Sequence, residues 1–280
     1  MSIYLAYDGS INANWIARYA IRMAANHPEK QLHVVYIEDA EVPAPELSAN
    51  VKQIEAEAAA VGVNAMLEVC PMHQGVFGGL VDYIPAGPQT FVICGARVKK
   101  GRRGFLAGTI SEQLLSLRHF NVLALRVVQP GLLGLPRDVL VPVSGDRQGI
   151  RAGLSILELM IRDIHRLHLL NIVEARRSPF RLQSSADTRK QRAQAMTYVR
   201  TIEDELLRDL AIDPKFVDSH VVVAKSWSRE TILHASRLHA HLIFIEAKHD
   251  SLTRRLLFDD EIEQLLGQAP CDVAVYRGVT

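Results

Sequence analysis

Residues 89–127, QTFVICGARVKKGRRGFLAGTISEQLLSLRHFNVLALRV, contain the pattern that decides the fold. The apolar run at residues 91–94 has the length and β-branching of a strand that is covered on both faces. After a glycine-rich loop, Gly108, Thr109 and Ser111 mark a helix start, because a Thr or Ser hydroxyl there accepts a hydrogen bond from a free backbone N–H. A second apolar run follows at residues 122–126. Strand, loop, helix and strand in this order predict a parallel sheet of the α/β class.

The loop between the first strand and the helix is rich in glycine and in positive charge. Its glycines and basic residues are Gly95, Gly101, Gly104, Gly108, Arg97, Lys99, Lys100, Arg102 and Arg103. A helix start after such a loop offers aligned N–H donors and a positive dipole end, which suits a phosphate group. The loop also leaves the carboxyl end of a parallel strand, where open α/β sheets bind ligands. It lacks the Lys-Ser/Thr ending of a P-loop, and a solvated charged surface is the alternative interpretation of its five charges.

The same pattern occurs twice in the chain. A constant offset of 151 places residues 91–127 on residues 242–278 without a gap, and the tetrapeptide EQLL at residues 112–115 then falls on EQLL at residues 263–266. The opening strands match at a smaller offset of 136, so the second copy is the longer one. This register predicts two homologous α/β units in tandem.

The boundary between the two units is predicted at residues 128–136 (VQPGLLGLP), which contain two prolines and two glycines and no periodicity. An N-terminal domain is then expected at residues 1–127 and a C-terminal domain at residues 137–280, each with a mainly parallel five-stranded sheet. Strands are expected at 3–7, 31–38, 64–70, 91–94, 122–126, 139–143, 167–173, 216–224, 241–247 and 273–277. Helices are expected at 12–26, 46–61, 76–84, 148–165, 188–210 and 229–238, in addition to the one that begins near Gly108.

Composition narrows the class of protein. A hydrophobic content of 48% is ample for two cores, and a net charge of +1 gives no global attraction to nucleic acid or anionic lipid. The three cysteines show no CxxC spacing, which favours a reducing compartment. No apolar run approaches the roughly 20 residues of a membrane span, and no basic-then-apolar signal region opens the chain. We therefore expect a soluble cytosolic protein with neither a membrane nor a nucleic-acid partner.

The loop resembles the nucleotide loop of the universal stress protein family, in which a glycine, two residues, a glycine and nine residues precede Gly-Ser/Thr. Gly95 fits the first position, Gly108 and Thr109 fit the last, and Val98 stands where the second glycine belongs. The family's opening strand followed by Asp-Gly-Ser is also present, at residues 8–10. The resemblance covers nearly the whole chain, in two copies.

This resemblance implies two tandem Rossmann-like domains of the adenine nucleotide α-hydrolase type. It also implies an adenine nucleotide, ATP, with or without magnesium, bound in the N-terminal half. Asp8 would lie near the ribose or adenine, Val34 would meet the base, and Gly95 would let the backbone pass close to the ribose and phosphates. Phosphate would be held through the N–H and hydroxyl groups of Gly108, Thr109, Ile110 and Ser111. The family does not fix basic residues in this loop, but Arg97, Lys99, Arg102 and Arg103 are able to add charge-assisted bonds.

The C-terminal copy is expected to have lost this site. In the register of 151, Gly95 corresponds to Glu246, and residues 108–110 correspond to Asp259, Asp260 and Glu261. Two like charges about 4 Å apart repel by about 4 kcal/mol at an effective dielectric of about 20, so these acids would oppose a phosphate. The sequence thus predicts one nucleotide site per chain.

Three functions remain open at this point: an ATP-binding regulatory module, a nucleotide-free scaffold for an unknown protein partner, and an enzyme that hydrolyses ATP slowly. No residue stands out as a catalytic base, no metal site is expected, and the basic segment 176–192 is interpreted as a solvated loop and helix start rather than a nucleic-acid site. The last strands of the two copies are expected to be sheet edges, and relatives commonly dimerise through this strand. The two copies would then pair within one chain as a pseudo-dimer, and two chains could pair as a homodimer.

Overall fold

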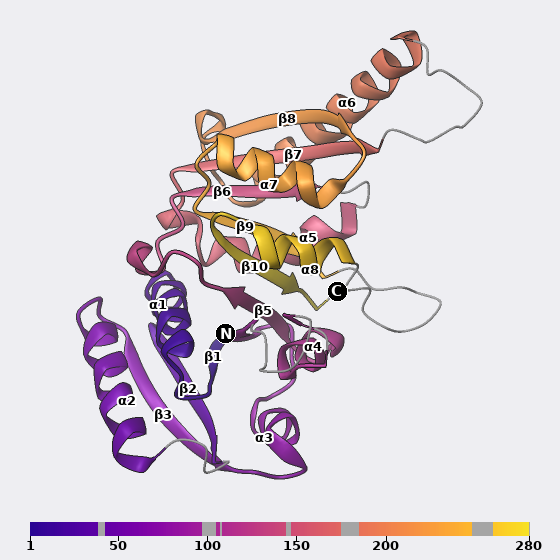
Figure 1. The fold of residues 1–280 in the computed structure, drawn as a ribbon. Coiled ribbons are helices and arrows are strands. Elements are labelled where there is room, and N and C mark those ends of the chain that lie inside the picture. The colour runs from indigo at the N-terminus through magenta and orange to yellow at the C-terminus, as the bar shows by residue number, and fades with distance from the viewer. Residues whose placement is uncertain are drawn as a thin grey trace.

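The protein is seen in a computed structural model, which describes residues 1–38, 43–96, 105–106, 108–143, 147–174, 185–247 and 260–279. Figure 1 shows one continuous twisted sheet with helices on both faces. The sheet has ten strands in the order β3-β2-β1-β4-β5-β10-β9-β6-β7-β8. The predicted α/β class is confirmed, with five mainly parallel strands from each half of the chain.

The elements of the N-terminal half follow the predicted alternation. They are β1 (Ser2–Tyr7), α1 (Ile11–Asn26), β2 (Gln31–Glu38), α2 (Ala44–Ala59), β3 (Asn64–Pro71), α3 (Gly75–Tyr83), β4 (Thr90–Gly95), α4 (Ile110–Ser116) and β5 (Asn121–Arg126). Helices α1 and α2 cover one face of the strands, and α3 and α4 cover the other (Figure 1).

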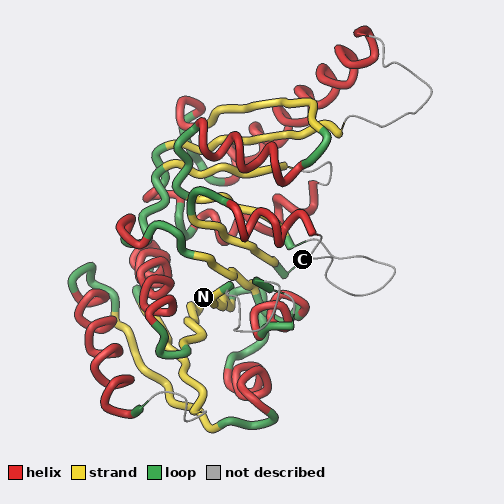
Figure 2. The backbone as a smooth tube through the Cα atoms, viewed as in Figure 1, coloured by secondary structure: helices red, strands yellow, loops and turns green. Residues whose placement is uncertain are grey.

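The elements of the C-terminal half repeat this order after a 3-10 turn at Pro130–Leu132. They are β6 (Asp138–Val143), α5 (Arg147–Glu158), β7 (Arg166–Glu174), α6 (Ser185–Asp209), β8 (Val217–Ala224), α7 (Trp227–Arg237), β9 (Leu242–Glu246), α8 (Asp260–Gln268) and β10 (Asp272–Arg277). Figure 2 shows one end of α6 extending well beyond the rest of the molecule.

One predicted element is wrong at its end. The helix expected at residues 148–165 stops at Glu158 and is followed by a 3-10 turn at Ile161–Asp163. The carbonyl oxygen of Leu159 accepts a hydrogen bond of 2.9 Å from Asn26 Nδ2 at the end of α1, and Asn26 also bonds the Asp163 carboxylate at 3.0 Å. The Leu159 carbonyl oxygen, which would accept a backbone hydrogen bond if the helix continued, is therefore bonded to the other half of the chain instead.

The two halves join through β5 and β10, the only antiparallel pair recorded among the described strands. Ala124 pairs with Val275, its own counterpart in the offset of 151, and the flanking pairs are symmetric about it. This register is that of a two-fold axis. The predicted pairing of the two last strands within one chain is confirmed.

A buried carboxylate reinforces the same junction. Asp272, at the start of β10, is fully buried and accepts hydrogen bonds from the Tyr19 hydroxyl at 2.6 Å and from the backbone N–H groups of Val128 and Gln129 at 2.6 and 2.8 Å. Burial raises the pKa of Tyr19 well above its usual value, and the Asp272 charge adds to this rise. The phenol therefore stays protonated and serves as a donor.

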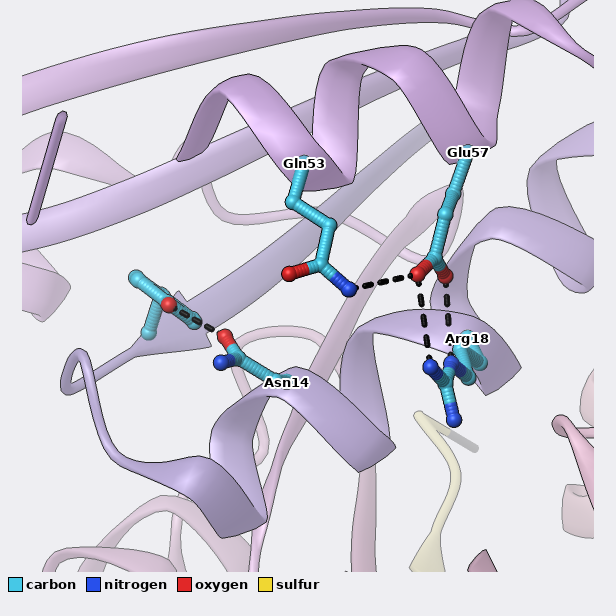
Figure 3. Close-up of polar contacts among 5 residues, drawn as sticks. Asn14, Arg18, Gln53 and Glu57 are labelled. Atoms are coloured by element: carbon cyan, nitrogen blue, oxygen red, sulfur yellow. Dashed lines mark hydrogen bonds and ion pairs between the residues drawn. The ribbon is translucent and has the colours of Figure 1, made fainter. Parts of the chain in front are cut away.

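Helix α1 is also held to α2 by side-chain contacts (Figure 3). Arg18 donates two hydrogen bonds to Glu57, at 3.1 and 3.3 Å, and Gln53 donates a third at 3.0 Å. Burial alone would raise the pKa of Glu57, but the bonds from Arg18 and Gln53 outweigh it and the pKa is lowered. These contacts hold α1 in place, and α1 forms one wall of the candidate functional site.

Candidate functional site

A cavity of about 480 Å³ lies at the carboxyl ends of β1, β4 and β5. Strand β1 leads through α1 to one side of the sheet and β4 leads through α4 to the other, so the cavity lies where the strand order reverses. Such switch points are where open α/β sheets bind ligands, and the volume is that of a typical small-molecule site.

Most of the residues predicted for the site meet in this cavity. Asp8, Gly95, Thr109, Ile110 and Ser111 all line it. They come from three separate segments, namely the end of β1, the end of β4 and the start of α4. Gly108 adjoins Thr109 but is not among the lining residues. Arg97, Lys99, Arg102, Arg103 and Val98 lie outside the described residues.

Val34 does not line the cavity, contrary to the prediction. It packs in the hydrophobic core on the α1 side of β2, whereas its neighbours Val35 and Ile37 line the cavity. Alternate residues of a strand point to opposite faces. Because β2 is buried on both faces, its hydrophobic pattern does not reveal which set of side chains faces a ligand.

The Asp-Gly-Ser turn has a structural role as well as its place in the cavity. Asp8 is exposed, and its Oδ1 accepts a 3.0 Å hydrogen bond from Ser10 N. Gly9 has a φ of 73°, a left-handed conformation that favours glycine. Ser10 Oγ accepts from Ala13 N at 3.1 Å and caps α1. The turn therefore places a carboxylate at the mouth of the cavity.

Two buried hydroxyl groups fix the start of α4, one to the preceding loop and one to β4. Of the two cap residues that the sequence left open, Thr109 rather than Ser111 is the N-cap. Its Oγ1 accepts from Glu112 N at 3.2 Å and donates to Leu106 O at 2.6 Å. Ser111 Oγ donates to Gly95 O at 2.5 Å. Both hydroxyl hydrogens are thus committed to carbonyl groups of the protein.

Gly95 keeps the end of β4 close to α1. A Cβ at this position would lie 3.0 Å from Cδ1 of Ile16, which is tighter than ordinary van der Waals contact. The equivalent residue of the C-terminal half is Glu246. The prediction that Gly95 permits a close approach is consistent with this geometry, although the approaching atoms here belong to α1.

Arg126 and Phe105 line the cavity and were not predicted as site residues. The Arg126 guanidinium carbon lies 4.9 Å from the centre of the Phe105 ring, in a cation–π arrangement. Burial lowers the pKa of Arg126, and the Asp272 charge only partly offsets this. The one sequence signal that marks Arg126 is its position, because it is the charged residue that directly follows an apolar strand at its carboxyl end.

A carboxylate from the C-terminal half holds the end of the glycine-rich loop. Glu263 on α8 accepts hydrogen bonds from the backbone N–H of Phe105 at 2.6 Å and of Leu106 at 2.9 Å. The C-terminal half therefore positions part of the wall of the N-terminal cavity, which the sequence alone did not indicate.

The equivalent place in the C-terminal half is packed differently. A Cβ at Gly278 would lie 2.1 Å from the carbonyl oxygen of Ala152, so α5 passes directly against the end of β10. Tyr276 stacks on Phe244 with 4.2 Å between ring centres. Val127 and Leu125, the counterparts of Gly278 and Tyr276, line the cavity of the N-terminal half.

The walls of the cavity combine apolar surface with charged groups. Apolar side chains such as Val35, Ile37 and Leu80 form one side, with the Asp8 carboxylate and the Arg126 guanidinium as charged groups. Cys94 also lines it, but burial raises the pKa of its thiol to about 12, so it is not a thiolate at neutral pH. Across the described ranges, no group of three His, Cys, Asp or Glu side chains is arranged to hold a metal ion.

Residues 136–277 match the model of the Universal stress protein family. The match covers half of the sequence, and the chain therefore belongs to this family. It falls on the C-terminal half, whose loop departs further from the family's nucleotide motif than that of the N-terminal half. No curated protein matches the sequence.

Solved structures share the fold over the full length of the chain. A universal stress protein from Archaeoglobus fulgidus has a TM-score of 0.64 at 15% identity, covering 99% of this chain and 98% of its own. A functionally unknown protein from Pseudomonas aeruginosa has a TM-score of 0.63 at 14% identity, covering 99% and 92%. The cytoplasmic domain of a prokaryotic cation chloride cotransporter has a TM-score of 0.61 at 13% identity, covering 99% and 95%. Within the described part of this chain, no helix is both long and apolar enough to cross a membrane.

Proposed function

We propose that the protein is a regulatory universal stress protein that binds one adenine nucleotide, ATP, in the cavity of its N-terminal half. The observation that carries the proposal is the meeting of Asp8, Gly95 and residues 109–111 around one cavity at the switch point of the sheet. The apolar wall suits a purine base, and Asp8 can accept hydrogen bonds from ribose hydroxyls. Arg126 supplies positive charge for phosphate. ATP bound in the cavity would contact the surrounding helices, which can respond to its presence.

The C-terminal half is the proposed unoccupied partner. Glu261, the counterpart of Ile110, accepts hydrogen bonds from Ser226 Oγ at 3.2 Å and from Trp227 N at 3.1 Å. Its carboxylate therefore caps the start of α7 at the place where a phosphate would have to approach. Negative charge and a structural role together disfavour a second nucleotide.

The experiment is native mass spectrometry of the full chain with and without ATP and magnesium. The expected result is a gain of one nucleotide per chain. Gly95→Val should abolish this gain, because the new side chain meets Ile16 and fills the cavity. Gly131→Val is the matched control, since a Cβ at Gly131 meets no atom within 4 Å and the position is remote from the cavity. Two nucleotides per chain would contradict the one-site proposal.

A second candidate is a nucleotide-free interaction scaffold. The observation that favours it is the commitment of the Thr109 and Ser111 hydroxyls to carbonyl groups of the protein. Under this function, no nucleotide binds at millimolar ATP, and Gly95→Val leaves the protein's interactions unchanged. Steady-state release of phosphate at enzyme-like rates would instead indicate the ATP-hydrolysing enzyme.

A further inference from the structure

Arg126 carries a buried donor that the protein leaves unused. The residue ends β5 and its side chain lines the cavity. Its Nη1 atom is shielded from solvent and, within the part of the chain that the structure describes, has no hydrogen-bond partner. Buried polar groups are almost always hydrogen-bonded, so an unpaired guanidinium N–H beside an open cavity indicates a missing acceptor.

The guanidinium is held in place before any ligand arrives. It lies over the Phe105 ring at 4.9 Å, and the backbone N–H of Phe105 is in turn fixed by the Glu263 carboxylate at 2.6 Å. The ring also rests against α8, since a Cβ at Gly267 would be 3.7 Å from Phe105 Cε2. Little side-chain entropy remains to be lost when an acceptor binds.

The carboxylate that offsets the positive charge of Arg126 is already hydrogen-bonded to other groups. Asp272 is the acid that acts on Arg126. Its two oxygens accept hydrogen bonds from Tyr19 and from the backbone at residues 128 and 129. Asp272 therefore offsets the charge of Arg126 at a distance without satisfying its N–H groups.

The pseudo-symmetry provides an internal comparison. Arg277 is the counterpart of Arg126, and its Nη1 donates to the carbonyl oxygen of Ala247 at 3.0 Å. The backbone is the same in both places, because Ala96 N and Ala247 N donate to Leu125 O and Tyr276 O at 2.8 Å each. The same residue is thus internally satisfied in the C-terminal half and left available in the half that has the cavity.

We propose that Arg126 binds the anionic group of the cavity's ligand and makes the site selective for phosphorylated nucleosides over the free nucleoside. A guanidinium presents a planar set of donors that matches phosphate oxygens. This inference rests on the proposed nucleotide function, because the cavity must hold a nucleoside for such selectivity to have meaning.

The test is calorimetric titration of the full chain with adenosine, AMP and ATP. Arg126→Met is expected to weaken AMP and ATP binding about 10- to 100-fold, as loss of a charged hydrogen bond does, and to leave adenosine binding unchanged. Arg277→Met is the matched control and should change neither, with circular dichroism confirming that both variants are folded. Arg126→Lys should fall between the wild type and Arg126→Met, since it keeps the charge without the fork.

Other outcomes are equally decisive. An equal loss of adenosine and AMP binding in Arg126→Met, or a wild type that binds adenosine as tightly as AMP, would overturn the proposal. If the wild type binds neither nucleoside nor nucleotide, the proposed function fails, and titration with tripolyphosphate then decides the role of Arg126. Polyphosphate binding that Arg126→Met weakens would support an anion site, whereas no polyphosphate binding would overturn it.

Discussion

The two halves of the chain have the same strand order but differ at the carboxyl ends of their strands. In the N-terminal half, Val127 and Leu125 line a cavity, and Arg126 faces it with an unused donor. In the C-terminal half, α5 closes against Gly278, and Arg277 bonds the protein's own backbone. Equivalent positions therefore border a cavity in one repeat and serve internal packing in the other.

The junction gives the largest expected effect. Asp272 and Asn121 are counterparts, and each accepts from the chain after the opposite last strand, Asp272 from Val128 N and Asn121 from Val279 N at 3.0 Å. Asp272→Ala should lower the free energy of unfolding by about 3–5 kcal/mol, because it leaves Tyr19 and two backbone N–H groups without their acceptor. Asn121→Ala should cost about 1–3 kcal/mol. Urea unfolding measures both, and equal small losses would show that the two junction sites are interchangeable.

A smaller effect is expected where α5 closes the C-terminal half. Gly278→Ala should lower the free energy of unfolding by about 1–3 kcal/mol, because the new methyl group overlaps the Ala152 carbonyl. Gly131→Ala is the control, with space around its Cβ and no expected loss. If Gly278→Ala were as stable as this control, the close packing of α5 would not be a fixed property of this half.

The smallest expected effect on the free energy of unfolding, and the one that depends most on pH, comes from the histidines of the two halves. His33 in the N-terminal half lies 3.6 Å from Glu68, and its counterpart His168 lies 3.6 Å from Asp218 but also faces His220, with ring centres 5.7 Å apart. Burial lowers the pKa of His168 and of His234, and His220 adds to both shifts. A lowered pKa disfavours the protonated form in the folded state. The stability contributed by the neutral rings is therefore complete above the pKa of about 6.5 of an unfolded histidine and is lost as the pH falls below it.

Urea unfolding at pH 7.5 and pH 5.5 tests this prediction. His168→Phe should reduce the loss of stability at the lower pH. An unchanged pH dependence in His168→Phe would contradict the prediction.

Much of the fold could be predicted from the sequence, because an internal repeat can be read directly from the order of the residues. The offset of 151 predicted which residues of β5 and β10 are equivalent, and the structure adds that the two strands pair symmetrically with Ala124 opposite Val275. The resemblance of the glycine-rich loop and of the Asp-Gly-Ser turn to the family's motifs pointed to Asp8, Gly95, Thr109, Ile110 and Ser111, which line one cavity. The division into domains at residues 127 and 137, the homodimer and the bound nucleotide remain predictions.

The order of residues was enough to predict the alternation of strands and helices, the repeat and a hydroxyl cap at Thr109 or Ser111, since these depend on local periodicity and on hydrogen bonds between near neighbours. The packed structure was needed to show that Val35 rather than Val34 faces the cavity and that α5 ends at Glu158. It also decided that Arg126 is available while Arg277 is satisfied. These outcomes depend on which distant segments supply space, acceptors and charge, and residue order does not specify that without the packed chain.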